Sequence, residues 1–247
     1  PLTSMFMHNS SLDASDIPDY RPAVHDSDGL QILTGKGEIL WRPLNNPKDL
    51  QISAFSDKSP KGFGLIQRSR SLSDYQDLEA HYQTRPSAWI KPTNDWGDGH
   101  IELVEIPSAA ENNDNIVAFW QQKNGLKKDN AYTYQYLMTW SNDTPVSLDS
   151  PRIVRSAKGT KLFGEDPEVV IDFNKMSDVN IDDLTIEAST SQGKAVEAHL
   201  TKNPYNNGVR AFFTFDPEGA SSTELRVQLK QGDKAAAPTW LYRWLEE

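Results

Sequence analysis

Two short segments in the first half of the chain combine carboxylates with an indole or an imidazole: HDSDG at residues 25–29 and NDWGDG at residues 94–99. In the second segment, the ring of Trp96 is suited to stacking on a sugar. Its apolar bulk would also raise the pKa of Asp95, so that this acid stays protonated near neutral pH. We therefore predict that Asp95 is a catalytic acid of glycoside chemistry. The alternative is a simple turn before a strand, since Asp98-Gly99 is a common turn dipeptide.

The HDSDG segment has three interpretations. Its oxygen-rich loop could bind Ca²⁺, but the later Glu of an EF-hand loop is missing. Its Asp side chains could cap backbone amides in an ordinary turn. The third interpretation, which we favour, places His25, Asp26 and Asp28 in a loop that contacts substrate. A serine triad using His25 and Asp28 is disfavoured because no G-x-S-x-G motif occurs. We predict no metal and no cofactor.

Aromatic and arginine side chains are concentrated in the same half of the chain. Taken singly, each arginine is more often part of a surface ion pair and each aromatic ring more often part of a core. Together they favour a carbohydrate-binding groove, because rings stack on sugars and guanidinium groups bind hydroxyls. At least one of three indoles, Trp41, Trp89 and Trp96, should line an open groove beside Asp95. The further predicted contacts are Arg42, Arg68 and Tyr75.

Composition limits the class of protein. The chain has 247 residues, a net charge of −10 and no cysteine. This charge gives no general attraction to nucleic acid or to anionic membranes, and the lack of cysteine excludes disulfides and thiolate metal sites. No apolar run approaches the roughly 20 residues of a membrane-spanning helix. The chain begins at Pro1 without an initiator methionine, and we expect it to be a fragment or a processed product.

The elements that would position these residues are mostly strands. Short β-type runs separated by Pro, Gly and Asn turns recur along the chain, which predicts an all-β protein built from antiparallel sandwiches. One helical turn is expected over residues 72–82, with Ser73 as a candidate cap. The polar stretch at residues 121–130 suggests a boundary between domains 1–124 and 125–247. The second part has the size and strand number of an immunoglobulin-like sandwich.

Seven motifs in the first half, taken in order, resemble one known family. They are PLTSMF, RPAVHDSDGL, WRPLNNP, KGFGLIQR, YQDLEAHYQTRPSAWIKP, DWGDGHIELVEIP and DNIVAFW. Together they resemble the periplasmic glucan biosynthesis proteins G and D. The resemblance is dense from Pro1 to about Trp120 and looser afterwards, where the family has an immunoglobulin-like domain.

The resemblance implies a periplasmic protein that acts on osmoregulated glucans with a β-1,2-linked glucose backbone, as an inverting glycoside hydrolase. The family's general acid is an aspartate in the cleft of the large sandwich, which we transfer to Asp95, with Asp98 as the fallback. Family proteins are about twice as long, so the general base could lie outside this chain. The implied partners are a β-1,2-glucan and the inner-membrane glucan synthase machinery. A non-catalytic glucan-binding or scaffolding module is the alternative.

Overall fold

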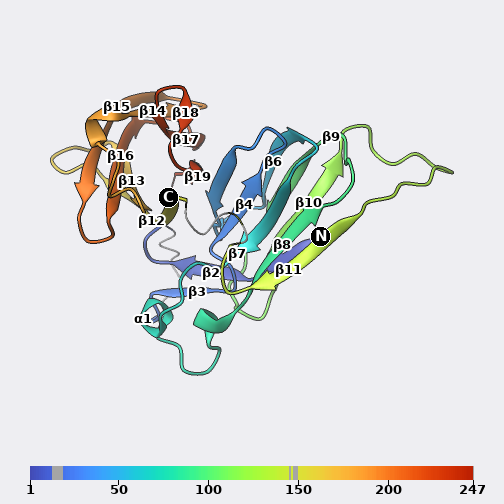
Figure 1. Ribbon diagram of the computed structural model, residues 1–247. Coiled ribbons are helices and arrows are strands. Elements are labelled where there is room, and N and C mark those ends of the chain that lie inside the picture. Colours follow the sequence, from blue (N-terminus) through green and yellow to red (C-terminus); the bar gives the residue numbers. More distant parts are fainter. Residues whose placement is uncertain (13–18, 145, 147–149, 247) are drawn as a thin grey trace. The chain divides into compact units, whose positions relative to one another are not determined.

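The computed structural model describes residues 1–12, 19–144, 146 and 150–246. Strands dominate it, and the predicted all-β sandwich class is confirmed (Figure 1). The chain divides into two compact units, which we describe separately. The first comprises residues 1–38 and 44–146, and the second comprises residues 39–43 and 147–247. None of the helices in the described ranges has the length and hydropathy needed to span a membrane.

The first unit contains two four-stranded antiparallel sheets and a small ribbon. In one sheet the order is β1 (Leu2–Ser4), β10 (Ile116–Gln122), β9 (Asp98–Glu105) and β6 (Gln51–Lys58). In the other it is β11 (Tyr136–Ser141), β8 (Ser87–Pro92), β7 (Gly62–Ile66) and β4 (Gly29–Leu33). The ribbon pairs β2 (Phe6–Asn9) with β3 (Ala23–His25).

Strand β9 shows how the sequence selects the buried face of a sheet. Ile101, Leu103 and Glu105 are fully buried, whereas the alternate positions are partly exposed, as period-2 alternation predicts. Glu105 is a charged residue at a core position. It accepts a hydrogen bond from the backbone N–H of Asn45 at 2.7 Å. This contact fixes the chain after Leu44 against the sheet.

Strand β7 carries two glycines for a steric reason. A Cβ atom at Gly62 would lie 2.4 Å from the indole of Trp89, and one at Gly64 would lie 2.2 Å from the carbonyl oxygen of Ala88. The missing side chains therefore let β8 and its indole approach the β7 backbone. Trp89 is 4% exposed as a result.

The expected helix over residues 72–82 is wrong in extent. Helix α1 covers only Leu72–Tyr75, and a 3₁₀ turn, η1, follows at Tyr82–Thr84. The N-cap is Ser71 in a capping box with Asp74, not Ser73. The helix ends because Gln76 adopts a left-handed conformation with φ of 57°.

The second unit also contains two sheets. One has the order β12 (Arg152–Thr160), β13 (Pro167–Asn174), β16 (Gly208–Asp216) and β15 (Lys194–Asn203), all antiparallel. The other joins β14 (Leu184–Thr190), β17 (Ser222–Gln231) and β19 (Thr239–Leu245), with the short β18 (Lys234–Ala235) paired to β17. Strand β5 (Ile39–Pro43) pairs in parallel with β19. The 3₁₀ turn η2 covers Ile181–Asp183.

A buried polar contact and a tight turn stabilise this second unit. The indole N–H of the fully buried Trp240 donates to Ser156 Oγ at 2.9 Å. A hairpin turn joins β15 to β16 at residues 204–207, and Asn207 in this turn has a positive φ of 53°. Asparagine is among the residues that tolerate this conformation best.

The two units do not divide at the expected polar stretch. Residues 125–146 group with the first unit, in which β11 pairs with β8. Ile39–Pro43 group with the second unit, in which β5 pairs with β19. A boundary at 124/125 therefore separates β11 from its neighbouring strand. The functional division into a glucan-processing domain and an immunoglobulin-like domain stays a prediction.

Candidate functional site

Asp95 lies in the loop between β8 and β9 and is exposed. Its Oδ1 accepts hydrogen bonds from the hydroxyl of Ser59 and from the backbone N–H of Gly97, the latter at 2.8 Å. The Ser59 hydrogen bond is the main cause of a lowered pKa of Asp95. The expected raised pKa is therefore wrong, because hydrogen-bond donors and water stabilise the charged form here. Asp98 is also exposed, at the start of β9.

Trp96, next to Asp95, faces the interior of the first unit. Its indole N–H donates to Asn94 Oδ1 at 3.0 Å, and its ring makes edge-on contacts with Phe63, Tyr134 and Tyr136. The residue is only 9% exposed. Its ring is thus held by other aromatic rings, which explains why it does not shield the Asp95 carboxylate.

Trp96 lines an apolar pocket of about 500 Å³ in the first unit. The pocket lies between residues of both four-stranded sheets, because Leu2 and Trp120 come from one sheet and Ile90 and Met138 come from the other. Its walls are mainly aromatic and aliphatic, which is typical of ligand pockets. Asp95 is not among the residues that line it.

The other indoles of the predicted groove are buried. Trp89 packs over the glycines of β7, as described above. Trp41 and Arg42 belong to β5 in the second unit and are 2% and 1% exposed. The guanidinium of Arg42 lies over the ring of Tyr242, 5.6 Å from its centroid. Neither indole therefore presents an open face for sugar stacking in this structure.

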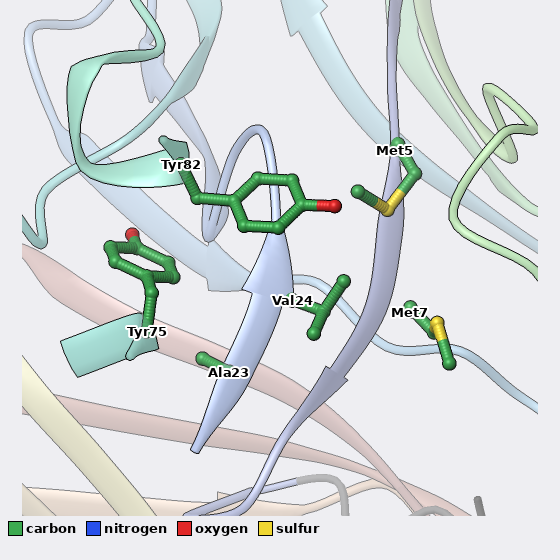
Figure 2. Close-up of a cluster of buried hydrophobic side chains, with 6 residues drawn as sticks. All are labelled: Met5, Met7, Ala23, Val24, Tyr75 and Tyr82. Carbon is green, nitrogen blue, oxygen red and sulfur yellow. The ribbon is translucent and has the colours of Figure 1, made fainter. Parts of the chain in front are cut away.

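A different part of the first unit concentrates ionisable groups around the β2–β3 ribbon. Figure 2 shows the apolar base of this region, where Tyr75 of α1 and Tyr82 of η1 gather with Met5, Met7, Ala23 and Val24. Both tyrosines are buried, and burial raises the pKa of each hydroxyl. These neutral side chains form a rigid support for the loop that follows β3.

His25, the last residue of β3, belongs to that support. It is 1% exposed, stacks on Phe6 with ring centroids 5.4 Å apart, and meets Tyr75 edge-on at 5.2 Å. Burial lowers the pKa of the imidazole to about 4, so His25 is neutral at physiological pH. The structure thus gives His25 a packing role beneath the loop.

Asp26 follows directly and lies at the edge of the buried region. Its backbone N–H donates to the carbonyl oxygen of Met5 at 2.9 Å, and 31% of its side chain is exposed. Arg85 Nε lies 3.3 Å from Asp26 Oδ1. Burial nevertheless raises the pKa of Asp26, and the negative charge of Asp114 adds to this increase. A half-exposed carboxyl with a raised pKa is suited to exchanging a proton with a ligand.

Asp28 and Arg68 form the neighbouring ion pair. Arg68 Nε donates to Asp28 Oδ2 at 2.9 Å, and the carboxylate is buried whereas 22% of the arginine side chain is exposed. The fold therefore places three of the predicted substrate contacts, Asp26, Asp28 and Arg68, in this region. We call Asp26, Asp28, Arg68 and Arg85 the Asp26 site.

A second group of charges stabilises the loops next to the Asp26 site. Arg21 donates to Asp19 at 2.7 Å and to Asp77 at 2.6 Å, and its guanidinium lies 2.8 Å from Glu111. The Arg21 hydrogen bond lowers the pKa of Asp19 to about 2. Glu111 also accepts a hydrogen bond from the Tyr82 hydroxyl at 2.9 Å. No cluster of three or more metal-ligating side chains occurs in the ranges that the structure describes.

Sequence reasoning missed Arg21 and counted Arg85 only among the arginines that together favour a carbohydrate groove, although both residues have a local signal. Arg85 precedes a proline, which favours an extended residue at the end of a helical turn, and the structure shows this conformation. Arg21 precedes Pro22 in the same way. What the sequence does not reveal is that these two arginines reach carboxylates far along the chain, at Asp26 and Asp77.

Comparison with known proteins identifies the family. The family model described as "Periplasmic glucan biosynthesis protein, MdoG" matches residues 1–244. Glucans biosynthesis protein G 2 of Shewanella oneidensis is 54% identical over 244 residues, which are 99% of this chain and 46% of that protein. Glucans biosynthesis protein G of Shewanella sp. strain MR-4 is 43% identical over 248 residues, covering 99% of this chain and 45% of the relative.

The chain thus spans a little under half the length of the curated relatives that it matches. The match extends through both units, since it ends only three residues before the last residue of the sequence. The resemblance noted in the motifs is therefore confirmed. The chain belongs to the family of periplasmic glucan biosynthesis proteins described as MdoG.

Proposed function

We propose that the full-length protein hydrolyses the β-1,2-linked glucose backbone of periplasmic glucans, with inversion at the anomeric carbon, and that it does so in the periplasm. Family membership supports the link to glucan biosynthesis. The inner-membrane glucan synthase machinery would supply the polymer on which it acts. The hydrolytic step is the part of this proposal that depends on the site.

The observation that carries the hydrolytic step is the environment of Asp26. Inverting hydrolysis needs one carboxyl that donates a proton to the leaving oxygen and another that accepts a proton from water. Either role is most efficient when the pKa of the group approaches the working pH. Burial raises the pKa of Asp26, and its side chain still reaches solvent.

The Asp26 site also has the features of sugar recognition. Arg68 and Arg85 are partly exposed, and each is paired with one of the two aspartates. Charged groups that are fixed by ion pairs are well suited to donating hydrogen bonds to sugar hydroxyls. We propose that Asp26 transfers the proton and that Arg68, held by Asp28, contacts the glucan.

Asp95 is the competing proposal for the acid, with Asp98 as its fallback. Its exposed position leaves room for a substrate. However, a lowered pKa makes Asp95 less able to keep a proton at neutral pH. For Asp95 to act as the acid, the rest of the full-length protein or the bound glucan would have to exclude water from this loop.

A non-catalytic glucan-binding module is the second candidate function. It is favoured by the aromatic pocket that contains Trp96, because an apolar pocket holds a ligand without any proton transfer. The two functions differ in their need for Asp26. If the protein is a binding module, the wild type binds glucan without cleaving it, and Asp26→Asn keeps the same affinity for glucan.

Three full-length proteins test the proposal: the wild type, Asp26→Asn and Asp95→Asn. Each is incubated with linear β-1,2-glucan, and the products are sized over time. We expect turnover by the wild type and a loss of about 10²–10⁴-fold in Asp26→Asn, which is the usual contribution of general acid–base catalysis. Loss in Asp95→Asn with normal turnover in Asp26→Asn would reverse the assignment. Binding without turnover in the wild type would support the binding module.

A further inference from the structure

Arg70 lies beside the Asp26 site but points at backbone, not at a carboxylate. Its guanidinium donates to the carbonyl oxygen of Gln67 at 2.8 Å, to that of Gln83 at 3.3 Å and to that of Arg85. It also lies 3.4 Å from Ser87 Oγ. One side chain thus connects the end of β7 to the segment between η1 and β8.

The planar shape of the guanidinium explains why an arginine occupies this position. Several carbonyl oxygens from two chain segments converge on it, and a rigid fork of five N–H donors can satisfy them together. The side chain is partly buried, and burial lowers the pKa of Arg70 without removing its charge at neutral pH.

The segment that Arg70 fixes carries the guanidinium that faces Asp26. The carbonyl oxygen of Arg85 accepts from Arg70, whereas the side chain of Arg85 extends to Asp26 Oδ1 and over the ring of Tyr82 at 5.8 Å. Arg85 also donates to the carbonyl oxygen of Ala80 at 3.1 Å. The backbone of Arg85 is thus fixed from the β7 side, and its side chain is fixed by Tyr82 and Ala80.

We propose that Arg70 is a positioning residue that acts through Arg85: by fixing the backbone at residues 83–85, it sets the distance between the Arg85 guanidinium and the Asp26 carboxylate. The inference deepens the proposed function, because it concerns the same carboxyl. The charges that act on Asp26 are those of Arg85 and Asp114. Arg70 acts electrostatically on Asp28, Tyr75 and Asp143 instead, so its effect on Asp26 is indirect.

The test measures the protonation of Asp26 directly. The full-length protein is labelled with ¹³C at aspartate carboxyl carbons, and the Asp26 resonance is assigned by its loss in Asp26→Asn. Its titration midpoint is then measured in the wild type, Arg70→Met, Arg85→Met and the double variant. Arg210→Met is the control, because that arginine pairs with Asp172 in the second unit.

We expect Arg70→Met and Arg85→Met each to raise the midpoint by about 0.5–1 pH unit, since a nearby positive charge is withdrawn from a half-exposed carboxylate. The decisive comparison is the double variant, whose midpoint should equal that of Arg85→Met. If Arg70 affects the pKa of Asp26 only by positioning Arg85, removing Arg70 has no further effect once the Arg85 guanidinium is absent. If Arg70→Met raises the midpoint equally in both backgrounds, or changes nothing in the wild-type background, the inference is overturned.

A second variant covers the case in which Arg70→Met does not fold. Arg70→Lys keeps the charge and three donors but loses the fork, so it should raise the midpoint by a smaller amount. An unchanged midpoint in a folded Arg70→Lys protein counts against the inference. The titration does not depend on turnover, so a wild type that fails to cleave glucan contradicts the proposed hydrolysis and leaves the coupling between Arg70 and Asp26 measurable.

Discussion

Asn115 is the side chain whose removal should most clearly destabilise the support of the Asp26 site. It is 2% exposed, and its amide makes three hydrogen bonds to backbone. Oδ1 accepts from the N–H of Phe6 at 2.8 Å, and Nδ2 donates to the carbonyl oxygens of Phe6 at 2.9 Å and Ile106 at 3.0 Å. Phe6 in turn stacks on His25, directly before Asp26.

The Asn115→Ala substitution deletes all three bonds and leaves buried backbone groups without these partners. A net contribution of about 0.5–1.5 kcal/mol per hydrogen bond predicts a loss of about 2–4 kcal/mol in the free energy of unfolding of the first unit. With an m-value of roughly 3 kcal/mol/M in urea, the midpoint of that unit should fall by about 1 M. Asn112→Ala is the matched control, because Asn112 is exposed three residues away.

The assay is urea unfolding of the full-length protein, with amide hydrogen exchange reporting on the peptide that contains Phe6. We expect the midpoint and the protection of this peptide to fall together in Asn115→Ala and to stay constant in Asn112→Ala. A loss below about 0.5 kcal/mol in Asn115→Ala would show instead that water replaces the three hydrogen bonds of the amide at little cost in free energy.

Three further substitutions test other contacts of the first unit. Gly64→Ala should destabilise the first unit by about 1–3 kcal/mol in thermal or urea unfolding, because its Cβ would overlap a backbone carbonyl, whereas Gly159→Ala, with open space around it, should be near neutral. His25→Phe should flatten the dependence of stability on pH between about 6.5 and 4. In that window His25 binds a proton in the unfolded chain but stays neutral in the folded protein, so the stability of the wild type falls as the pH falls. A series of urea unfolding curves across this pH range measures the effect. Arg21→Met should reduce stability at pH 7. The wild type should lose stability between about pH 4 and 2, because the Asp19 carboxylate, whose pKa is lowered by Arg21, is protonated in this range. Arg21→Met should remove this loss, and unchanged acid unfolding would contradict the expectation.

Regular strands were the part of the fold most accessible from the sequence. The structure places strands where such patterns occur: β9 alternates with period 2, and β13, β16 and β17 are short runs rich in β-branched and aromatic residues. These patterns depend only on residues that are close in sequence, so they can be recognised without knowledge of the long-range packing. The expected extent of helix α1 was wrong because Gln76 ends the helix in a left-handed backbone conformation, which a glutamine side chain does not predict.

The candidate site was less predictable, because it depends on long-range packing. Placing a tryptophan beside Asp95 suggested an apolar environment for the carboxyl, but the ring turns towards Phe63 and Tyr134 and leaves Asp95 in water. The sequence also singled out the loop at residues 25–29, and its role in substrate contact stays a prediction. Its distinctive feature, the raised pKa of Asp26, arises from burial and from the negative charge of Asp114, whereas the positive charge of Arg85 opposes the increase. No local sequence pattern connects Asp26 with these two distant residues.

The anomeric form of the first product shows whether the full-length protein cleaves a β-1,2-glucan by inversion, as we propose. Linear β-1,2-glucan is incubated with the full-length wild type, and ¹H NMR follows the new reducing end before mutarotation. We expect the α-anomer to appear first, because water attacks the face opposite to the leaving group in a single displacement. Initial release of the β-anomer, or bound glucan that is never cleaved, would contradict it.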